Sequence, residues 1–323
     1  MSRRRWLVAL ALIGMLAPAI ASAQAYPSRP ITMVVPFVAG GPIDIIGRLF
    51  APRLSTWLGQ PVLIDNRGGA GSTIGTAFVA NAPPDGYTLL LASNSGLVIA
   101  PHVYKNLSYD PVKSFAAVSI AGVHIFGFAA SLALPVRTVK DLIEYARSKP
   151  GQLNYGSSGI GTGPHLLGEA FKLTTGVQAT HVPYKGGAPA VLELIAGRID
   201  YLFEGFNNLL PHIRSGKIKA LAIVSSKRTS VLPDVPTMSE LGIFESVPGI
   251  WSGVVAPAGT PVAIVQRVSA DVQKLMASRD IADALLAQGI EPAASTPAEF
   301  AGFLQAEHAK WGEVVRAAGV KVE

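Results

Sequence analysis

The sequence predicts an α/β fold of two lobes around a central cleft, and three observations support this prediction. With 323 residues, the chain is longer than one average domain, so two lobes are the first expectation. Short apolar strand-like segments alternate with segments of helical periodicity, which indicates parallel βαβ units. Two apolar, extended segments, residues 115–134 and 251–256, interrupt this alternation, and we interpret them as crossovers between the lobes.

The two crossovers predict how the lobes are divided along the chain. Residues 26–123 and 252–323 would form the first lobe, and residues 124–251 the second. In open α/β sheets, ligands bind beyond the carboxyl ends of the strands. Polar, glycine-rich turns follow at least four of the predicted strands, so a ligand cleft between the lobes is favoured over a purely structural pair of lobes.

Residues 1–25 have the three regions of an export signal. A basic start, Arg3-Arg4-Arg5, precedes a run of twelve apolar residues, and small-x-small patterns end at Ala23 and Ala25. The apolar run is short for a membrane span, so an uncleaved anchor is the less favoured alternative. The paired arginines leave both the Sec and the Tat export route open.

The composition excludes several classes of protein. Half of the residues are hydrophobic (49%) and 15% are charged, which allows a large core and excludes disorder. Removing the three arginines of the signal from 27 basic residues leaves 24 against 21 acidic ones, a net charge of +3 that is too mild to indicate nucleic acid. There is no cysteine, and the six histidines lack metal-ligand spacing. Known catalytic motifs are absent, although a triad assembled in space stays open.

A glycine-rich turn follows the first predicted strand. It contains Gly40 and Gly41, and Pro42 occupies the first helical position of the next segment. Backbone N–H groups at such a helix start bind anions well, but two glycines could also simply allow the chain to turn. Asp44 lies in the first helical turn, where we interpret it as structural or as positioning water.

A second loop, residues 156–165, is the strongest candidate binding site. Ser157, Ser158 and Thr162 supply hydroxyl groups among four glycines, just before a helix. This combination suits a carboxylate held by neutral donors, with a flexible surface loop as the alternative. His165 would either donate to the ligand or be satisfied by a neighbouring carbonyl. Glu204, placed after a predicted strand over residues 199–203, would accept a ligand hydroxyl or amine, or pair across the hinge.

Several short motifs, in order along the chain, are similar to a known family. The chain resembles the Bug proteins, or TctC-type receptors, which are solute-binding components of tripartite tricarboxylate transporters. The motifs are Pro36-Phe37-x-x-Gly40-Gly41-x-x-Asp44, Asn66-Arg67-x-Gly69-Ala70-Gly71, Pro84-Asp85-Gly86-Tyr87-Thr88-Leu89, Tyr109-Asp110-Pro111-Val112, Gly156-Ser157-Ser158-Gly159-x-Gly161-Thr162-x-x-His165, Val182-Pro183-Tyr184-Lys185-Gly186, Leu232-Pro233-Asp234-Val235-Pro236-Thr237 and Ala256-Pro257-x-Gly259-Thr260-Pro261.

The resemblance implies a monomeric periplasmic binding protein of the two-lobed, type II-like fold. It implies that a small carboxylate is held by the first-lobe turn, partly through water, and by the second-lobe loop, and is delivered to transporter membrane subunits. No cofactor, metal, nucleic-acid partner or catalytic residue is expected. The residues predicted to bind the ligand are Phe37, Ala39, Gly40, Gly41, Asp44, Ser93, Ser157, Ser158, Gly161, Thr162, His165, Pro183, Tyr184 and Glu204.

Three departures from the family pattern keep the solute open. Ile43 stands where threonine is frequent, Gly68 replaces a usual proline, and Glu204 replaces a common aspartate. Two other functions stay open beside transport: a protein that presents its ligand to a membrane sensor, and a periplasmic enzyme acting on a carboxylated substrate.

Overall fold

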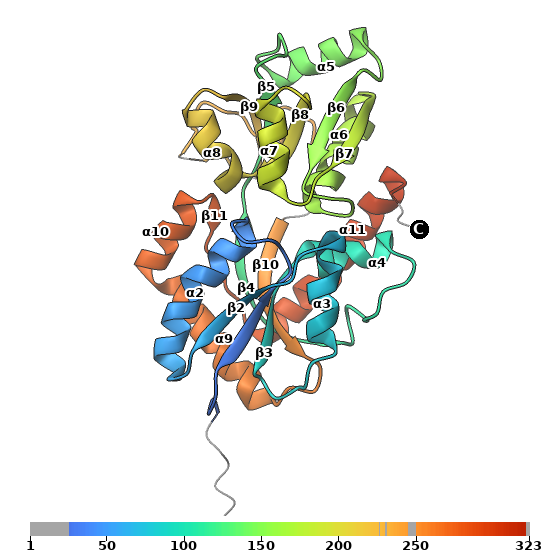
Figure 1. The fold of residues 1–323 in the computed structure, drawn as a ribbon. Coiled ribbons are helices and arrows are strands. Elements are labelled where there is room, and N and C mark those ends of the chain that lie inside the picture. Colours follow the sequence, from blue (N-terminus) through green and yellow to red (C-terminus); the bar gives the residue numbers. More distant parts are fainter. Residues whose placement is uncertain (1–25, 226, 230, 245–249, 321–323) are drawn as a thin grey trace, which may run out of the picture.

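The computed structural model describes residues 26–225, 227–229, 231–244 and 250–320, and Figure 1 shows two lobes, one above the other. The predicted export signal lies outside these residues. Within them, no helix combines the length and the apolar character that crossing a membrane requires. The predicted α/β fold with two lobes is confirmed.

The first lobe is built on a mixed six-stranded sheet. Its strand order is β11-β4-β10-β3-β1-β2, in which β1, β2 and β3 are parallel and β10 runs antiparallel to both β3 and β4. The predicted parallel units are therefore found in β1–β3, while the strand that returns from the second lobe enters in the opposite direction. The strands are β1 (Ile31–Val35), β2 (Val62–Asn66), β3 (Thr88–Ser93), β4 (Phe115–His124), β10 (Ile250–Pro257) and β11 (Ile290–Glu291).

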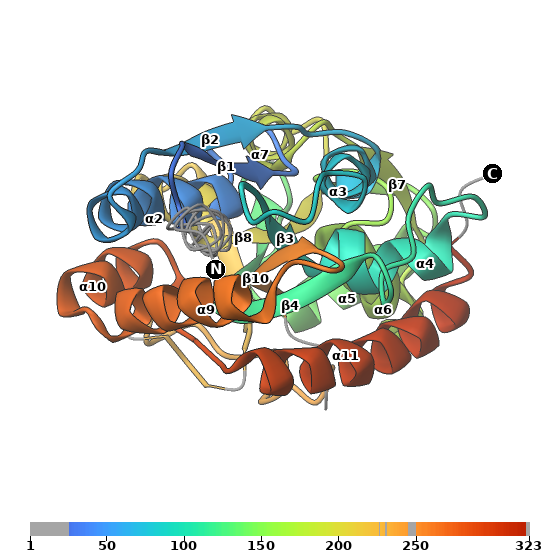
Figure 2. The same cartoon turned by 90° about the horizontal axis from the view of Figure 1, so that it is seen from below.

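Helices cover both faces of this sheet, because its central strands bury apolar side chains on both sides. In β1, Met33 and Val35 pack with one group of helices, and Val34 between them packs with the other. The first group is α2 (Pro42–Leu58), α9 (Val262–Ala277) and α10 (Arg279–Ala287). The second is α3 (Thr73–Ala80), the short turns η2 (Ala70–Ser72) and η3 (Ser95–Ile99), α4 (Ala100–Val103) and α11 (Pro297–Ala318), which runs along one edge of the lobe in Figure 2.

The second lobe is built on a mixed five-stranded sheet of order β7-β6-β8-β5-β9. Strands β6, β7 and β8 are parallel, and β5 is antiparallel to β8 and β9. Its strands are β5 (Phe126–Ser131), β6 (Leu153–Ser157), β7 (Ala179–Pro183), β8 (Tyr201–Gly205) and β9 (Ile218–Val224). Its helices are α5 (Val139–Ser148), α6 (Gly163–Thr175), α7 (Gly187–Ile195) and α8 (Phe206–Arg214).

The chain crosses between the lobes over one residue, Ile125, which separates β4 from β5. Both of its backbone groups are bonded: its N–H donates to the carbonyl of Gly289 (2.8 Å), and its carbonyl accepts from Phe206 N–H (3.1 Å). The predicted lobe boundaries fall inside the last residues of β4 and the first of β10. Residues 251–256, predicted as the return crossover, instead lie within β10.

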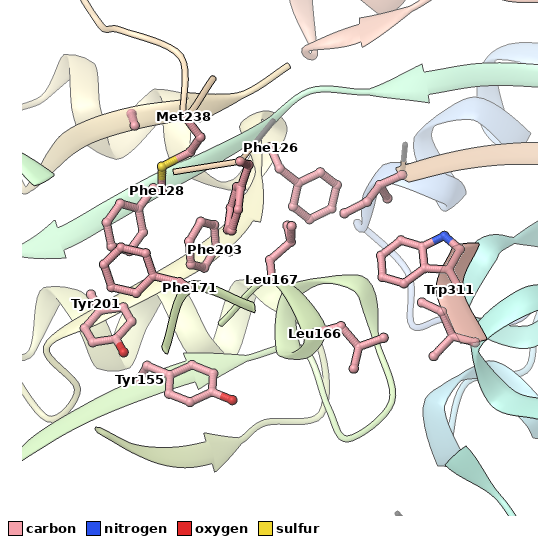
Figure 3. Close-up of a cluster of buried hydrophobic side chains, with 14 of the residues drawn as sticks. Phe126, Phe128, Tyr155, Leu166, Leu167, Phe171, Tyr201, Phe203, Met238 and Trp311 are labelled. Carbon is pink, nitrogen blue, oxygen red and sulfur yellow. The ribbon is translucent and has the colours of Figure 1, made fainter. Parts of the chain in front are cut away.

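One hydrophobic cluster extends from the second lobe into the first. It includes Phe128, Phe171 and Phe203 between the second sheet and α6, and Trp311 of α11. Figure 3 shows Trp311 on the side of Leu166, a residue of α6, and the two helices are in contact. Helix α11 therefore packs against both lobes.

Candidate functional site

A cleft between the lobes has an empty volume of about 580 Å³, with its open mouth included. Its walls are mainly apolar, with a few polar groups contributed by both lobes. The lining residues are Phe37, Val38, Gly41, Pro42, Ile43, Ser93, Asn94, Ser95, His124, Phe126, Ser158, Thr162, Gly163, Pro164, Gly186, Gly187, Glu204 and Ile250.

Three helices begin at the cleft, and none has a side-chain cap. The first residues of α2, α6 and α7 all line it, and their N-cap residues Gly41, Thr162 and Gly186 form no side-chain cap hydrogen bond. Away from the cleft, α5 and α11 begin with complete capping boxes, whereas α3, α8, α9 and α10 have no side-chain cap either. Uncapped helix starts carry partial positive charge and free N–H groups. Since no lysine or arginine lines the cleft, an anion there would be held by neutral donors.

The first-lobe turn is held by the carboxylate of Asp44, which is almost completely buried. It accepts hydrogen bonds from Gly40 N–H (2.8 Å), Arg48 Nε (2.7 Å) and Asn66 Nδ2 (2.9 Å). Burial acts to raise the pKa of Asp44, but these three donors outweigh it and hold the pKa below its usual value. Gly40 has φ of +87°, a left-handed conformation that favours glycine.

This network places three predicted binding residues outside the cleft lining. Asp44 faces its own donors, Gly40 N–H is already bonded to it, and Ala39 is exposed. From the same turn, Phe37 and Gly41 do line the cleft. The part of the first-lobe turn that borders the cleft is therefore the start of α2 and not the Gly40 N–H. Asp44 fixes the position of that helix start.

The second-lobe loop is held by hydroxyl groups. Thr162 Oγ1 donates to the carbonyl of Gly159 (2.7 Å), and Ser158 Oγ lies 3.3 Å from Thr162 Oγ1. Both Ser158 and Thr162 line the cleft. Ser157 lies behind them, completely buried, with its Oγ 2.7 Å from Nε2 of His181. Of the three predicted hydroxyl groups, two thus border the cleft and one supports the loop.

His165 also supports this loop and does not line the cleft. Its Nδ1 accepts from the N–H of Gly161 (3.1 Å), and its ring stacks on that of His181 with the centroids 3.9 Å apart. Burial lowers the pKa of His165 to about 4 and that of His181 to about 3, so both rings are neutral. A neutral His165 that accepts at Nδ1 carries its proton on Nε2. Its backbone partner is therefore an N–H group, where the sequence had suggested a carbonyl.

Pro183 and Tyr184 border a second hollow that shares Ser158 and Thr162 with the cleft. Its empty volume is about 1,330 Å³, open solvent included, and exposed Lys185 lines it as well. Pro183 and Tyr184 therefore lie beside the cleft, next to the second-lobe loop that carries Ser158 and Thr162.

Four buried polar atoms in the cleft have no hydrogen-bond partner among the described residues. They are Ser93 Oγ, Asn94 Nδ2, His124 Nδ1 and Glu204 Oε2, and each residue is at most 4% exposed. Buried polar groups are normally paired, so four unpaired atoms facing one cleft indicate a place for a polar ligand group. Asn94 and His124 were missed by the sequence reasoning. The available signal was His124 as the one titratable residue within the apolar segment 115–134.

Glu204 lies inside β8, not after it, because this strand begins and ends two residues later than predicted. Its Oε1 accepts from Gly205 N–H (2.9 Å) and from Asn208 Nδ2 (3.1 Å). It forms no ion pair with a described residue, and burial raises its pKa to about 7. The expected pairing of Glu204 across the hinge is thus not seen among the described residues.

The lobes touch across the cleft. A Cβ atom at Gly163, the first residue of α6, would lie 2.8 Å from Ile250 Cδ1 of β10. A Cβ atom at Gly186, before α7, would lie 3.2 Å from Val38 Cγ2, before α2. In the described conformation, the two lobes are therefore in contact beside the cleft.

Comparison with known proteins assigns the chain to a family. The family model described as tripartite tricarboxylate transporter family receptor (TctC) matches residues 46–320. The chain belongs to this family. The Bordetella pertussis protein BugT is 38% identical to it over 315 residues, which cover 97% of this chain and 96% of BugT. The Bug/TctC resemblance seen in the sequence motifs is confirmed.

Solved structures of the family share the fold. The periplasmic binding protein BugD is 36% identical, with a TM-score of 0.85 over 92% of this chain and 100% of BugD. An R. palustris protein with adipate is 36% identical, with a TM-score of 0.88 over 92% of this chain and 100% of its own. MatC of Rhodopseudomonas palustris, with bound malate, is 33% identical, with a TM-score of 0.83 over 90% and 100%. The family is one of periplasmic solute-binding receptors, and two of these relatives bind carboxylates.

Proposed function

We propose that this chain is a periplasmic receptor that captures a small carboxylate between its lobes and delivers it to the membrane subunits of a tripartite tricarboxylate-type transporter. The observation that carries this proposal is the convergence of three uncapped helix starts on a cleft without a cation. Such a cleft suits an anion with several acceptor positions, and a carboxylate has about four. The carboxylate-bound relatives support the same class of ligand.

In this proposal, each lobe contributes part of the carboxylate site. Ser158 and Thr162 reorient their hydroxyl groups toward the carboxylate, beside the free N–H groups at the start of α6. The start of α2 approaches from the first lobe, where Gly41 leaves the backbone accessible. Because the donors come from different lobes, the ligand favours the closed arrangement over an open one.

The remaining expectations belong to the same proposal. The lobes comprise residues 26–123 with 252–323 and residues 124–251, residues 1–25 direct export to the periplasm, and the receptor acts as a monomer without catalytic activity. Membership of a receptor family and the periplasmic location of BugD support the location and the role.

A thermal-shift screen of the purified mature protein against carboxylates tests the proposal. A ligand that binds only the folded state adds about 2.7 kcal/mol of stability at a hundred times its Kd, which raises Tm. Each acid is compared with its primary amide, which has the same shape without the charge. A rise in Tm with acids and not with amides supports the proposal. If amides act equally, or if no acid raises Tm, the cleft does not select carboxylates and the proposal fails.

A further inference from the structure

The four unpaired polar atoms of the cleft come in addition to the Ser158 and Thr162 hydroxyls and the helix N–H groups, so a single carboxylate does not occupy all of these groups. We propose that Glu204, as a neutral carboxylic acid, donates its proton to the second carboxylate of a dicarboxylate ligand, and that one proton is bound with the ligand. This inference rests on the proposed function and specifies its ligand class. It makes Glu204 the residue that distinguishes dicarboxylates from monocarboxylates.

The hydrogen bonds of Glu204 leave one of its oxygens available for this proton. Oε1 already accepts from Gly205 N–H and Asn208 Nδ2, so it is occupied as an acceptor. Oε2 has no partner among the described residues, and Glu204 lines the cleft. A proton on Oε2 would have no acceptor among the described residues, and a ligand carboxylate oxygen would be a strong acceptor for it.

No lysine or arginine lines the cleft to pair with an ionised Glu204 carboxylate. His124, at the end of β4, is the other titratable residue that lines the cleft, and burial lowers its pKa to about 4, which keeps it neutral. The neighbouring strands β5 and β6 bring no charged side chain. Charged and titratable residues of the helices packed nearby do not line the cleft: Asp44 and Arg48 of α2 pair with each other, Glu193 of α7 pairs with Arg198, and α8 carries His212 and Arg214 in its last turn.

Burial without a cation favours the neutral form of Glu204, and a ligand anion beside it favours that form further. The raised pKa of Glu204, about 7, agrees with this geometry. A second carboxylate would otherwise face an ionised glutamate within the cleft. Sharing one proton removes this repulsion, as it does wherever two carboxyl groups occupy one site.

The other unpaired atoms favour a ligand group that accepts hydrogen bonds. Asn94 Nδ2 is a donor only, while Ser93 Oγ and His124 Nδ1 can each act as donor. With a protonated Glu204, these side chains together offer hydrogen-bond donors to both oxygens of a carboxylate. A ligand ammonium group would instead require Glu204 in its ionised form, and it would leave the Asn94 donor without an acceptor.

Gly187 holds the Glu204 carboxyl group in place. A Cβ atom at Gly187 would collide with Cδ and Oε1 of Glu204 and with Nδ2 of Asn208. The carboxyl group is thus packed directly against the backbone at the start of α7, in space that a larger residue at position 187 would fill.

Calorimetry with defined probes tests the proposal. Succinate, glutarate and adipate are each titrated beside the monocarboxylate of equal chain length: butanoate, pentanoate and hexanoate. Titration at about pH 8, in two buffers of different ionisation enthalpy, should show close to one proton taken up with the tightest dicarboxylate and none with its monocarboxylate. Between about pH 6 and about pH 9, dicarboxylate affinity should fall roughly a hundredfold, because the fraction of protonated Glu204 falls about tenfold per pH unit above its pKa.

Glu204→Gln is the decisive variant, because an amide keeps an Oε1 acceptor and always carries a donor. It should retain dicarboxylate affinity at about pH 6 within roughly threefold and lose the pH dependence. Glu193→Gln, on the exposed side of α7, is the matched control and should behave as the wild type. If Glu204→Gln does not fold, the proton uptake of the wild type decides alone.

The outcomes separate this inference from the proposed function. Absence of proton uptake, equal affinity for both members of a chain-length pair, or loss of binding in Glu204→Gln with preference for an amine-bearing acid would each overturn the role of Glu204. All three would leave carboxylate capture intact. If no mono- or dicarboxylate binds at all, the proposed function has failed and the inference falls with it.

Discussion

The two loops that border the cleft are held in place by different chemistry. The first-lobe turn depends on an ionised group, since the Asp44 carboxylate gathers three donors around it. The second-lobe loop depends on neutral groups, the Ser157 and Thr162 hydroxyls and the stacked His165 and His181 rings. A charged network can fix a turn while staying behind it, whereas the hydroxyl network leaves Ser158 and Thr162 at the cleft surface. The comparison predicts that the two loops respond differently to acid and to substitution.

Acidification should produce the largest effect, and should affect the second-lobe loop first. His165 and His181 bind protons in the unfolded chain near pH 6.5 but in the folded protein only near pH 4 and pH 3. The unfolded state therefore holds more protons as the pH falls, and stability is lost from about pH 6.5 down to about pH 4. Each such histidine lowers the free energy of unfolding by up to about 1.4 kcal/mol for each pH unit of acidification in this range. Asp44, with its lowered pKa, adds its loss only below about pH 4.

Urea denaturation across this pH range measures the slope. His165→Asn preserves an acceptor for Gly161 N–H and should reduce the slope, while His212→Asn on α8 serves as the control. Equal slopes in His165→Asn and the wild type would show that this ring does not make the loop acid-sensitive.

Asp44→Ala should cause the next largest effect. It leaves the N–H of Gly40, Asn66 Nδ2 and Arg48 without their acceptor, and we expect a loss of about 3 kcal/mol in the free energy of unfolding. Asp65→Ala breaks a more exposed pair with Arg67 and should cost less than about 1 kcal/mol. Similar losses in both variants, measured by urea denaturation, would mean that the first-lobe turn does not depend on its buried charge.

Ser157→Ala should weaken the second-lobe loop by about 1–2 kcal/mol, because it removes a hydroxyl that bonds His181 Nε2 and Gly159 N–H. Ser148→Ala removes an exposed hydroxyl on α5 and should stay within about 0.5 kcal/mol of the wild type. Thermal unfolding of both variants checks this prediction, and a neutral Ser157→Ala would contradict the supporting role of that hydroxyl.

The hydroxyls at the cleft should have the smallest effect, and it should appear in ligand binding. Ser158→Ala combined with Thr162→Ala is expected to cost about 0.5–1.5 kcal/mol of carboxylate binding for each hydroxyl. Thr162→Ser keeps the hydroxyl and should bind as the wild type does. Calorimetry with the tightest acid from the thermal-shift screen measures the difference, and an unchanged double variant would exclude these hydroxyls from the site.

Much of the fold follows from local patterns. Gly59, Gly176 and Gly319 end helices in left-handed conformations, and Thr138 begins α5 with a capping box, as local residue preferences lead one to expect. The direction of a strand cannot be predicted from local patterns in this way, because the same apolar run of residues suits a parallel and an antiparallel pair. The direction of β10 is set by its pairing with β3 and β4, far away in the chain.

The parts of the candidate site that are formed by the backbone could be predicted from the sequence, and the parts formed by side chains could be predicted less well. Gly41 and Thr162 mark helix starts, which leave a local pattern in the residues around them. Asn94 and His124 face the cleft only because two distant strand ends meet there, and no spacing in the sequence records this. The role of Asp44 depends likewise on Asn66, which β2 brings alongside.

The contact of α11 with both lobes has a mechanical consequence. With Trp311 and Leu166 in one buried cluster and α11 in contact with α6, separating the lobes along that edge would expose apolar side chains to water. The edge where Val38 meets Gly186 buries far less, and Val38 is half exposed already. The lobes should therefore open by a hinge motion in which α11 and α6 stay in contact, and the ligand should enter from the opposite side.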